Sequence, residues 1–105
     1  MEVNDLTKIS TSVAAVLVHS KATVCVAESS AGGLICSSLL AVPGASAYFV
    51  GGGVIYTGGA RRAFLPDPGE SLSGVRSASE PYARWLAETV SGHLETTWAL
   101  AETGA

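Results

Sequence analysis

The sequence predicts an α/β fold in which helices cover both faces of a sheet, that is, a three-layer α/β/α sandwich. Three observations predict it. Several segments repeat apolar residues at helical spacing, three other runs are rich in β-branched or aromatic residues, and the two kinds of segment alternate along the chain. Of the 105 residues, 48% are apolar and 14% are charged. This length and composition predict one folded domain over residues 1–105.

The first element is predicted to be an amphipathic helix capped by Asn4 or Asp5. Its apolar positions recur at steps of three and four residues, at Val3, Leu6, Ile9, Val13, Val16 and Leu17. Ser20 and Lys21 end this pattern, and the run "ATVCVA" follows at residues 22–27. Such a β-branched run is typical of a strand that is buried on both faces.

A second helix is predicted to begin at Ala31 and to stop at Pro43 and Gly44. One face of it carries the apolar residues Leu34, Ile35, Leu39 and Val42. The next segment, "AYFVGGGVIYT" at residues 47–57, is predicted to be a second strand that three consecutive glycines interrupt. Glycines inside a strand indicate a bulge or a close approach of another backbone.

The second half of the chain is predicted to add two helices and a third strand. Residues 58–64 fit a short helix that carries Arg61 and Arg62, and "LPDPGESLSGVRS" at residues 65–77 is a long loop rich in turn formers. Ser79 is the expected N-cap of the last helix, with Gly92 as its C-terminal break. "TTWALAETG" then predicts a strand and the beginning of a turn.

Charge and cysteine content argue against several classes of function. A net charge of −3 leaves no basic patch for nucleic acid or an anionic membrane. No apolar run approaches the roughly 20 residues that span a bilayer. Cys25 and Cys36 lie in apolar segments, as expected for reduced, buried thiols of a cytoplasmic protein. We therefore expect no metal and no cofactor. The mean hydropathy of +0.37 is high for a small monomer, so we expect a homo-oligomer.

The segment "AESSAGG", residues 27–33, carries the chemistry that the sequence offers. It follows the first strand, and ligands of open α/β sheets bind at the carboxyl ends of strands, where helix N-termini supply free N–H groups. Ser29 or Ser30 is a candidate nucleophile there. A structural reading stays open and is favoured by the residue chemistry alone, because serine is among the commonest N-caps. Glu28 would support either reading, by orienting the serine or by accepting helix N–H groups.

Three motifs in register resemble one family. The run "VAESSAGGLICSSLLAVPGASAYFVGGGVIYT", residues 26–57, resembles the signature V-A-E-S-C-T-G-G-L and the following V-P-G of the CinA (competence/damage-inducible protein A) C-terminal domain family. "SEPYARWLAE" and "TTWALAETGA" resemble that family's later helix and its strand leading into T-G. We therefore expect residues 1–105 to form a partial domain of this family that lacks the last sheet and helix elements.

The resemblance implies a nicotinamide-nucleotide amidase, which converts nicotinamide mononucleotide into nicotinic acid mononucleotide and ammonia. Matched motif by motif, it implies Ser29 as the nucleophile and Tyr56 as its partner in proton transfer. It implies substrate-binding roles for Gly32, Gly33, Arg61, Thr103 and Gly104. The oxyanion is then expected to be held by N–H groups near Ala31 and Gly32, and Arg61 to contact the phosphate or the oxyanion.

Two departures from the family pattern bear on activity. Ala31 replaces a threonine of the motif, and Arg61 stands where many family amidases carry a lysine that activates the serine. Arginine stays protonated near neutral pH and cannot act as a base. An alternative is therefore a catalytically degenerate member that binds a nucleotide or another subunit without turnover. Hydrolysis of a different small amide is a third possibility.

Overall fold

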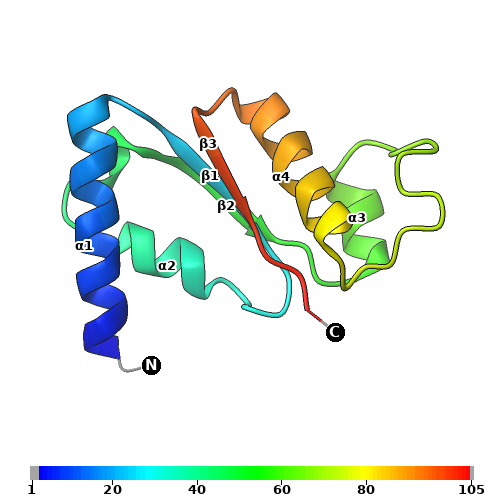
Figure 1. Cartoon of the computed structure of the whole chain (residues 1–105), viewed down its shortest axis with the longest axis horizontal. Coiled ribbons are helices and arrows are strands. Elements are labelled where there is room, and N and C mark those ends of the chain that lie inside the picture. Colours follow the sequence, from blue (N-terminus) through cyan, green and yellow to red (C-terminus); the bar gives the residue numbers. More distant parts are fainter. Residues whose placement is uncertain (1–2, 105) are drawn as a thin grey trace.

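The computed structural model describes the backbone of residues 3–104 and the side chains of residues 5–104. Helices lie on both faces of a sheet, with α1 and α2 on one side and α3 and α4 on the other (Figure 1). The predicted fold class is confirmed. The elements in chain order are α1 (Val3–Ser20), β1 (Val24–Glu28), α2 (Leu34–Leu40), the 3-10 helix η1 (Ala45–Ala47), β2 (Phe49–Val54), α3 (Gly58–Phe64), α4 (Glu80–Leu94) and β3 (Trp98–Ala101).

The sheet is parallel, and its strand order is β2-β1-β3. From β1 the chain passes through α2 to β2 on one side, and it then returns through α3 and α4 to β3 on the other side of β1. Because parallel crossovers are almost always right-handed, this reversal places α2 and α4 on opposite faces of the sheet. Every residue of β1 is buried, as the sequence predicts.

Side chains of β1 alternate between two apolar layers, as the two-residue period of a strand requires. Val24 and Val26 pack in the layer formed with α1 and α2, together with Ala14, Leu17, Ala22, Leu39, Ala45 and Tyr48. Ala27 packs on the opposite layer, against Tyr82 and Leu86 of α4. The sheet is therefore anchored on both faces through its central strand.

The glycine run does not interrupt β2, which continues through residues 51–53. Both features expected of strand glycines are present. A bulge lies where Val24 pairs with Phe49 and the next pair is Cys25 with Gly51. A Cβ on Gly52 would lie 2.6 Å from Cys36 Sγ and 2.6 Å from the Val26 carbonyl oxygen. The absence of a side chain at Gly52 thus allows α2 to pack closely on the sheet.

The predicted start of the first helix and the predicted end of the last helix are wrong. The first helix already begins at Val3, so Asn4 and Asp5 lie inside it and neither is the N-cap. The last helix does not stop at Gly92 but continues to Leu94, and Glu95 ends it with a φ of 54°. Helix ends depend on tertiary contacts as well as on local sequence, which explains such shifts of a few residues.

The start of α4 and the whole of α3 agree with the sequence. Ser79 caps α4, since its hydroxyl oxygen accepts a hydrogen bond from the Tyr82 N–H at 3.3 Å. The bounds of α3 are those predicted, and the hydroxyl of Thr57 caps it by accepting from the Ala60 N–H at 3.0 Å. Among the described residues no helix is both long enough and apolar enough to cross a membrane.

The close approach at Gly52 predicts a strong, position-specific effect on stability. We expect Gly52→Ala to lower the free energy of unfolding by about 2 kcal/mol or more, because the new methyl group overlaps a neighbouring carbonyl oxygen and thiol. Gly53→Ala is the matched control, since its nearest contact would be Ile55 Cδ1 at 4.0 Å. Urea unfolding of both variants measures the difference. Equal stability of the two would contradict the packing argument.

Candidate active site

Glu28, the last residue of β1, binds the end of the loop between β1 and α2 and the first turn of α2. This side chain is fully buried, and its carboxylate accepts hydrogen bonds from the N–H groups of Gly33 at 3.2 Å, Ile35 at 2.9 Å and Cys36 at 2.9 Å. The first N–H groups of a helix have no partner within the helix itself. Of the two roles left open for Glu28, the structure therefore shows the acceptor of helix N–H groups.

Glu28 and Cys36 shift each other's protonation in opposite directions. Burial acts to raise the pKa of the Glu28 carboxyl, but hydrogen bonds from the Cys36 thiol and from three backbone N–H groups outweigh it and lower that pKa. Burial, the hydrogen bond to Glu28 and its negative charge raise the pKa of Cys36 to about 12. At neutral pH the pair is thus a carboxylate and a thiol, and Cys36 is not a reactive thiolate.

A second carboxylate, Glu102, holds the same loop from the neighbouring strand. Its Oε1 accepts hydrogen bonds from the N–H groups of Ser29 at 2.9 Å and Ala31 at 2.8 Å, and its Oε2 accepts one from the Ser30 hydroxyl. Burial acts to raise the pKa of Glu102, but hydrogen bonds from the Ser30 hydroxyl and from the loop N–H groups lower it below the ordinary glutamate value. Glu102 is therefore ionised at neutral pH.

Glu102 was not among the predicted site residues, although a signal was present in the sequence. Glu102 follows directly on a predicted strand and precedes the T-G motif. In the sheet, Ala27 pairs with Ala101. The next residue on each chain segment, Glu28 at the end of β1 and Glu102 just after β3, therefore lies at the same edge of the sheet. Had the pairing of these two strands been known, the two glutamates would have been placed side by side.

The contacts of Glu102 change the predicted oxyanion site. The Ala31 N–H donates to Glu102, and the Gly32 N–H donates to the Ser29 carbonyl oxygen at 3.1 Å. Neither group is free to bind an oxyanion, so that expectation is wrong for this conformation. Gly32 and Gly33 have φ values of +65° and +101°, which explains why α2 begins at Leu34 and not at Ala31.

A pocket of about 500 Å³ lies at the carboxyl ends of the strands, between the loop after β1 and the start of α3. Five of the predicted site residues line it: Ser29, Tyr56, Arg61, Thr103 and Gly104. Gly32 and Gly33 are not among its lining residues, and their visible role is to shape the turn. This is the position at which open parallel sheets bind ligands, next to the strand where the order reverses.

The hydroxyl groups around this pocket differ in their partners. Ser29 Oγ makes no hydrogen bond within the described part of the chain, whereas Ser30 Oγ donates to Glu102. Tyr56 lies beyond the end of β2, not inside the strand as predicted, and is 71% exposed. Thr103 Oγ1 donates to the Ser77 carbonyl oxygen at 2.6 Å. This bond ties the end of β3 to the loop before α4.

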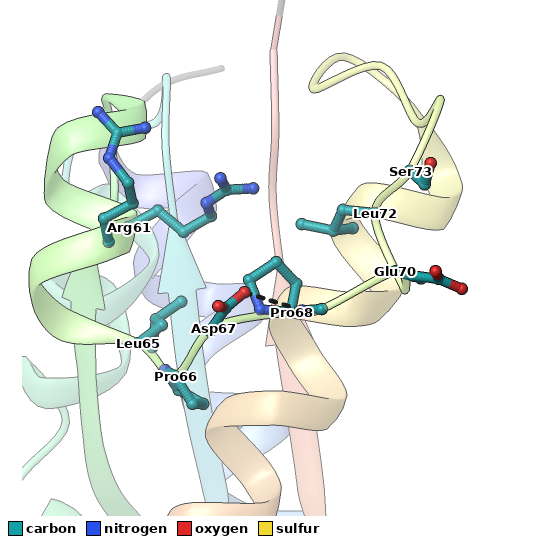
Figure 2. Close-up of a pocket in the computed structure, with 10 residues that line it drawn as sticks. Arg61, Leu65, Pro66, Asp67, Pro68, Glu70, Leu72 and Ser73 are labelled. Atoms are coloured by element: carbon teal, nitrogen blue, oxygen red, sulfur yellow. Dashed lines mark hydrogen bonds between the residues drawn. The ribbon is translucent and has the colours of Figure 1, made fainter.

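Arg61 stands between the pocket and a second one of about 640 Å³. Figure 2 shows Arg61 on α3, across this second pocket from Leu72 and Glu70 of the following loop. The turn of that loop is held by Asp67, whose carboxylate accepts from the Gly69 N–H at 2.9 Å. The Nε of Arg61 is buried and has no hydrogen-bond partner in the part of the chain that the structure describes. A cation with an unused donor thus borders both pockets.

Comparison with known proteins identifies the family of the chain. The sequence profile of the CinA C-terminal domain matches residues 6–105. The chain belongs to the CinA C-terminal domain family. It is 40% identical over 91 residues to a CinA-like protein of Gloeobacter violaceus, an alignment that covers 87% of this chain and 21% of that protein. A CinA-like protein of Myxococcus xanthus is 41% identical over 83 residues, covering 79% and 20% respectively.

Solved structures of competence/damage-inducible proteins have the same fold. The competence/damage inducible protein CihA from Agrobacterium tumefaciens matches with a TM-score of 0.82 and 28% identity, over 92% of this chain and 59% of that one. The competence damage-inducible protein A from Klebsiella pneumoniae matches with a TM-score of 0.83 and 23% identity, over 91% and 60%. The chain thus spans about a fifth of the relatives named above and about three fifths of these structures.

The lowered pKa of Glu28 predicts that the free energy of unfolding of the chain falls in acid. Its pKa in the folded chain lies below the ordinary value of 4.5, so its contribution is present above that value and is lost as the pH falls through the folded pKa. We expect Glu28→Gln to lower the free energy of unfolding by about 2 kcal/mol near neutral pH, because three N–H groups lose a charged acceptor.

This loss is expected to shrink as the solution is acidified, because the wild-type carboxyl is then protonated as well. Urea unfolding at a series of pH values measures it. Glu88→Gln, which changes an exposed carboxyl on α4, is the control. A Glu28→Gln effect that does not vary with pH would contradict the assignment.

Proposed function

We propose that this CinA C-terminal domain is an amidohydrolase that converts nicotinamide mononucleotide into nicotinic acid mononucleotide and ammonia. The observation that carries the proposal is the meeting of Ser29, Tyr56, Arg61 and Thr103 at one pocket, from three separate segments of the chain. Membership of the CinA family supports the same activity through the resemblance of the motifs that hold these residues. The substrate itself rests on that resemblance.

In the proposed mechanism Ser29 Oγ attacks the carboxamide carbon of the nicotinamide ring. Tyr56 relays the proton: its phenol oxygen accepts the serine proton, directly or through water, while its own proton passes to the amide nitrogen, so that the C–N bond breaks and ammonia leaves. Water then attacks the acyl-serine ester, which releases the nicotinate carboxylate and restores the serine hydroxyl. Ser29 suits the first step because its hydroxyl has no partner among the described residues and lines the pocket.

Arg61 is proposed to supply the positive charge that the reaction needs. The backbone N–H groups of Ala31 and Gly32 are occupied, so a developing oxyanion requires another donor. Arg61 lines the pocket, carries a guanidinium cation, and its Nε has no hydrogen-bond partner among the described residues. Its guanidinium can bind either the oxyanion or the substrate phosphate, and these two roles have different kinetic signatures.

A second candidate function is binding of a nucleotide without turnover. The contact of Glu102 with the Ala31 N–H favours this function, since the N–H group is then not available to an oxyanion. Arg61 also provides no base for the serine. Calorimetric titration with nicotinamide mononucleotide distinguishes the two: heat of binding with no ammonia released supports the binding protein, and ammonia release excludes it. A panel of other small amides tests the third possibility.

The nucleophile assignment predicts that Ser29→Ala abolishes ammonia release from nicotinamide mononucleotide. We expect kcat/KM to fall by at least about 10³-fold, since the covalent step is lost. Ser46→Ala, which removes an exposed hydroxyl on η1, is the matched control and is expected to leave the rate unchanged. Equal activity of wild type and Ser29→Ala would refute the nucleophile. No activity in any of the three would favour the binding function.

The role of Arg61 is decided by Arg61→Gln with two substrates. If the guanidinium binds the phosphate, KM rises for nicotinamide mononucleotide and not for nicotinamide riboside, which has no phosphate. If it stabilises the oxyanion, kcat falls for both substrates by about 10²-fold or more. Arg61→Lys is the companion variant, since it keeps a positive charge at neutral pH. Its rate of ammonia release is expected to rise at alkaline pH, because a deprotonated lysine amine can accept the serine proton. Unchanged kinetics in both variants would exclude Arg61 from the site.

A further inference from the structure

We propose that Glu102 is a positioning residue that leaves Ser29, and not Ser30, free to react. This inference rests on the proposed function, because it concerns which of two adjacent serines is the nucleophile. Both serines line the same pocket and have the same side chain. Ser30 is the more exposed of the two, so exposure alone would favour it. The contacts of the loop point the other way.

The hydroxyl of Ser30 is committed to a partner. It donates its proton to Oε2 of Glu102. The backbone of Gly104 packs against the same side chain, since a Cβ at that position would lie 2.2 Å from Ser30 Oγ and 2.8 Å from Ser30 Cβ. To attack a substrate, Ser30 would have to leave a charged acceptor and turn away from this wall.

The backbone on either side of Ser30 is held by the other oxygen of the same carboxylate. Oε1 of Glu102 accepts from the N–H groups of Ser29 and Ala31, at 2.9 and 2.8 Å. One carboxylate therefore binds three consecutive residues. Beyond them, Glu28 accepts from the N–H groups of Gly33, Ile35 and Cys36. The loop is fixed from both ends, and Ser29 Oγ is the hydroxyl in it that receives no partner from either glutamate.

An activating role for Glu102, as the base of Ser30, fits these contacts less well. A carboxylate that already accepts two backbone N–H groups is stabilised in its charged form, which makes it a weak proton acceptor for a serine hydroxyl. Its geometry is that of an anchor for the loop. Glu102 thereby determines which serine can react, because it binds the hydroxyl of Ser30 and leaves the hydroxyl of Ser29 unbound.

Two variants separate the contacts of Glu102. Glu102→Gln keeps one carbonyl oxygen that can accept from the Ser29 and Ala31 N–H groups, but its amide nitrogen cannot accept the Ser30 proton. Glu102→Ala removes all three acceptors. The Gln variant is therefore expected to free Ser30 while the loop stays largely in place, and the Ala variant to release the loop as well. Far-ultraviolet circular dichroism checks that both variants are folded.

The test is to label the 105-residue chain with a serine-directed fluorophosphonate and to locate the label by peptide mass spectrometry. We expect label on Ser29 in the wild type and on both serines in Glu102→Gln and Glu102→Ala. Amide hydrogen exchange is followed by NMR in the same proteins. We expect exchange of the Ser29 and Ala31 amides to be about tenfold faster or more in Glu102→Ala, with partial protection restored in Glu102→Gln.

Two results would overturn the proposal. One is label on Ser30 in the wild type that disappears in both Glu102 variants, because Glu102 would then activate Ser30. The other is unchanged labelling and unchanged amide exchange in Glu102→Ala. If neither serine of the wild type is labelled, the nucleophile of the proposed function fails. The role of Glu102 as the anchor of the loop is then decided by amide exchange alone.

Discussion

The buried carboxylate of Glu28 is the interaction on which the rest of the site depends. A charge without solvent contact is unfavourable unless hydrogen bonds replace the lost water, and here three N–H groups at the start of α2 do so. This arrangement joins the end of the central strand to the beginning of a helix. It sets where the chain turns after β1, and hence where the two serines of that turn are presented.

The topology of the sheet brings the residues that follow β3 next to the loop that follows β1. Because the order is β2-β1-β3, the last strand lies beside β1, and residues 73 positions apart in sequence are hydrogen-bonded there. Parallel strands end at the same edge, so the residues that follow β3 meet those that follow β1. Glu102 and Gly104 can therefore contact Ser30, and Thr103 joins the same edge to the loop before α4.

Features encoded in local sequence could be predicted, and features that depend on strand pairing could not. The bounds of α3, the cap at Ser79 and the complete burial of β1 follow from spacing and residue type. The contacts of Glu102 require knowing that β3 lies next to β1, which no local pattern reveals. The second helix is present, but its predicted start at Ala31 is wrong because the two following glycines adopt positive φ values.

The pocket and the core do not depend on the same parts of the chain. The loop that carries Ser29 is hydrogen-bonded to Glu102, so its shape requires β3 to lie beside β1, and these bonds join residues more than 70 positions apart. The apolar layer between the sheet and helices α1 and α2, in contrast, is built from residues between 14 and 49. A change that detaches the last strand is therefore expected to disturb the pocket while that layer keeps its own contacts.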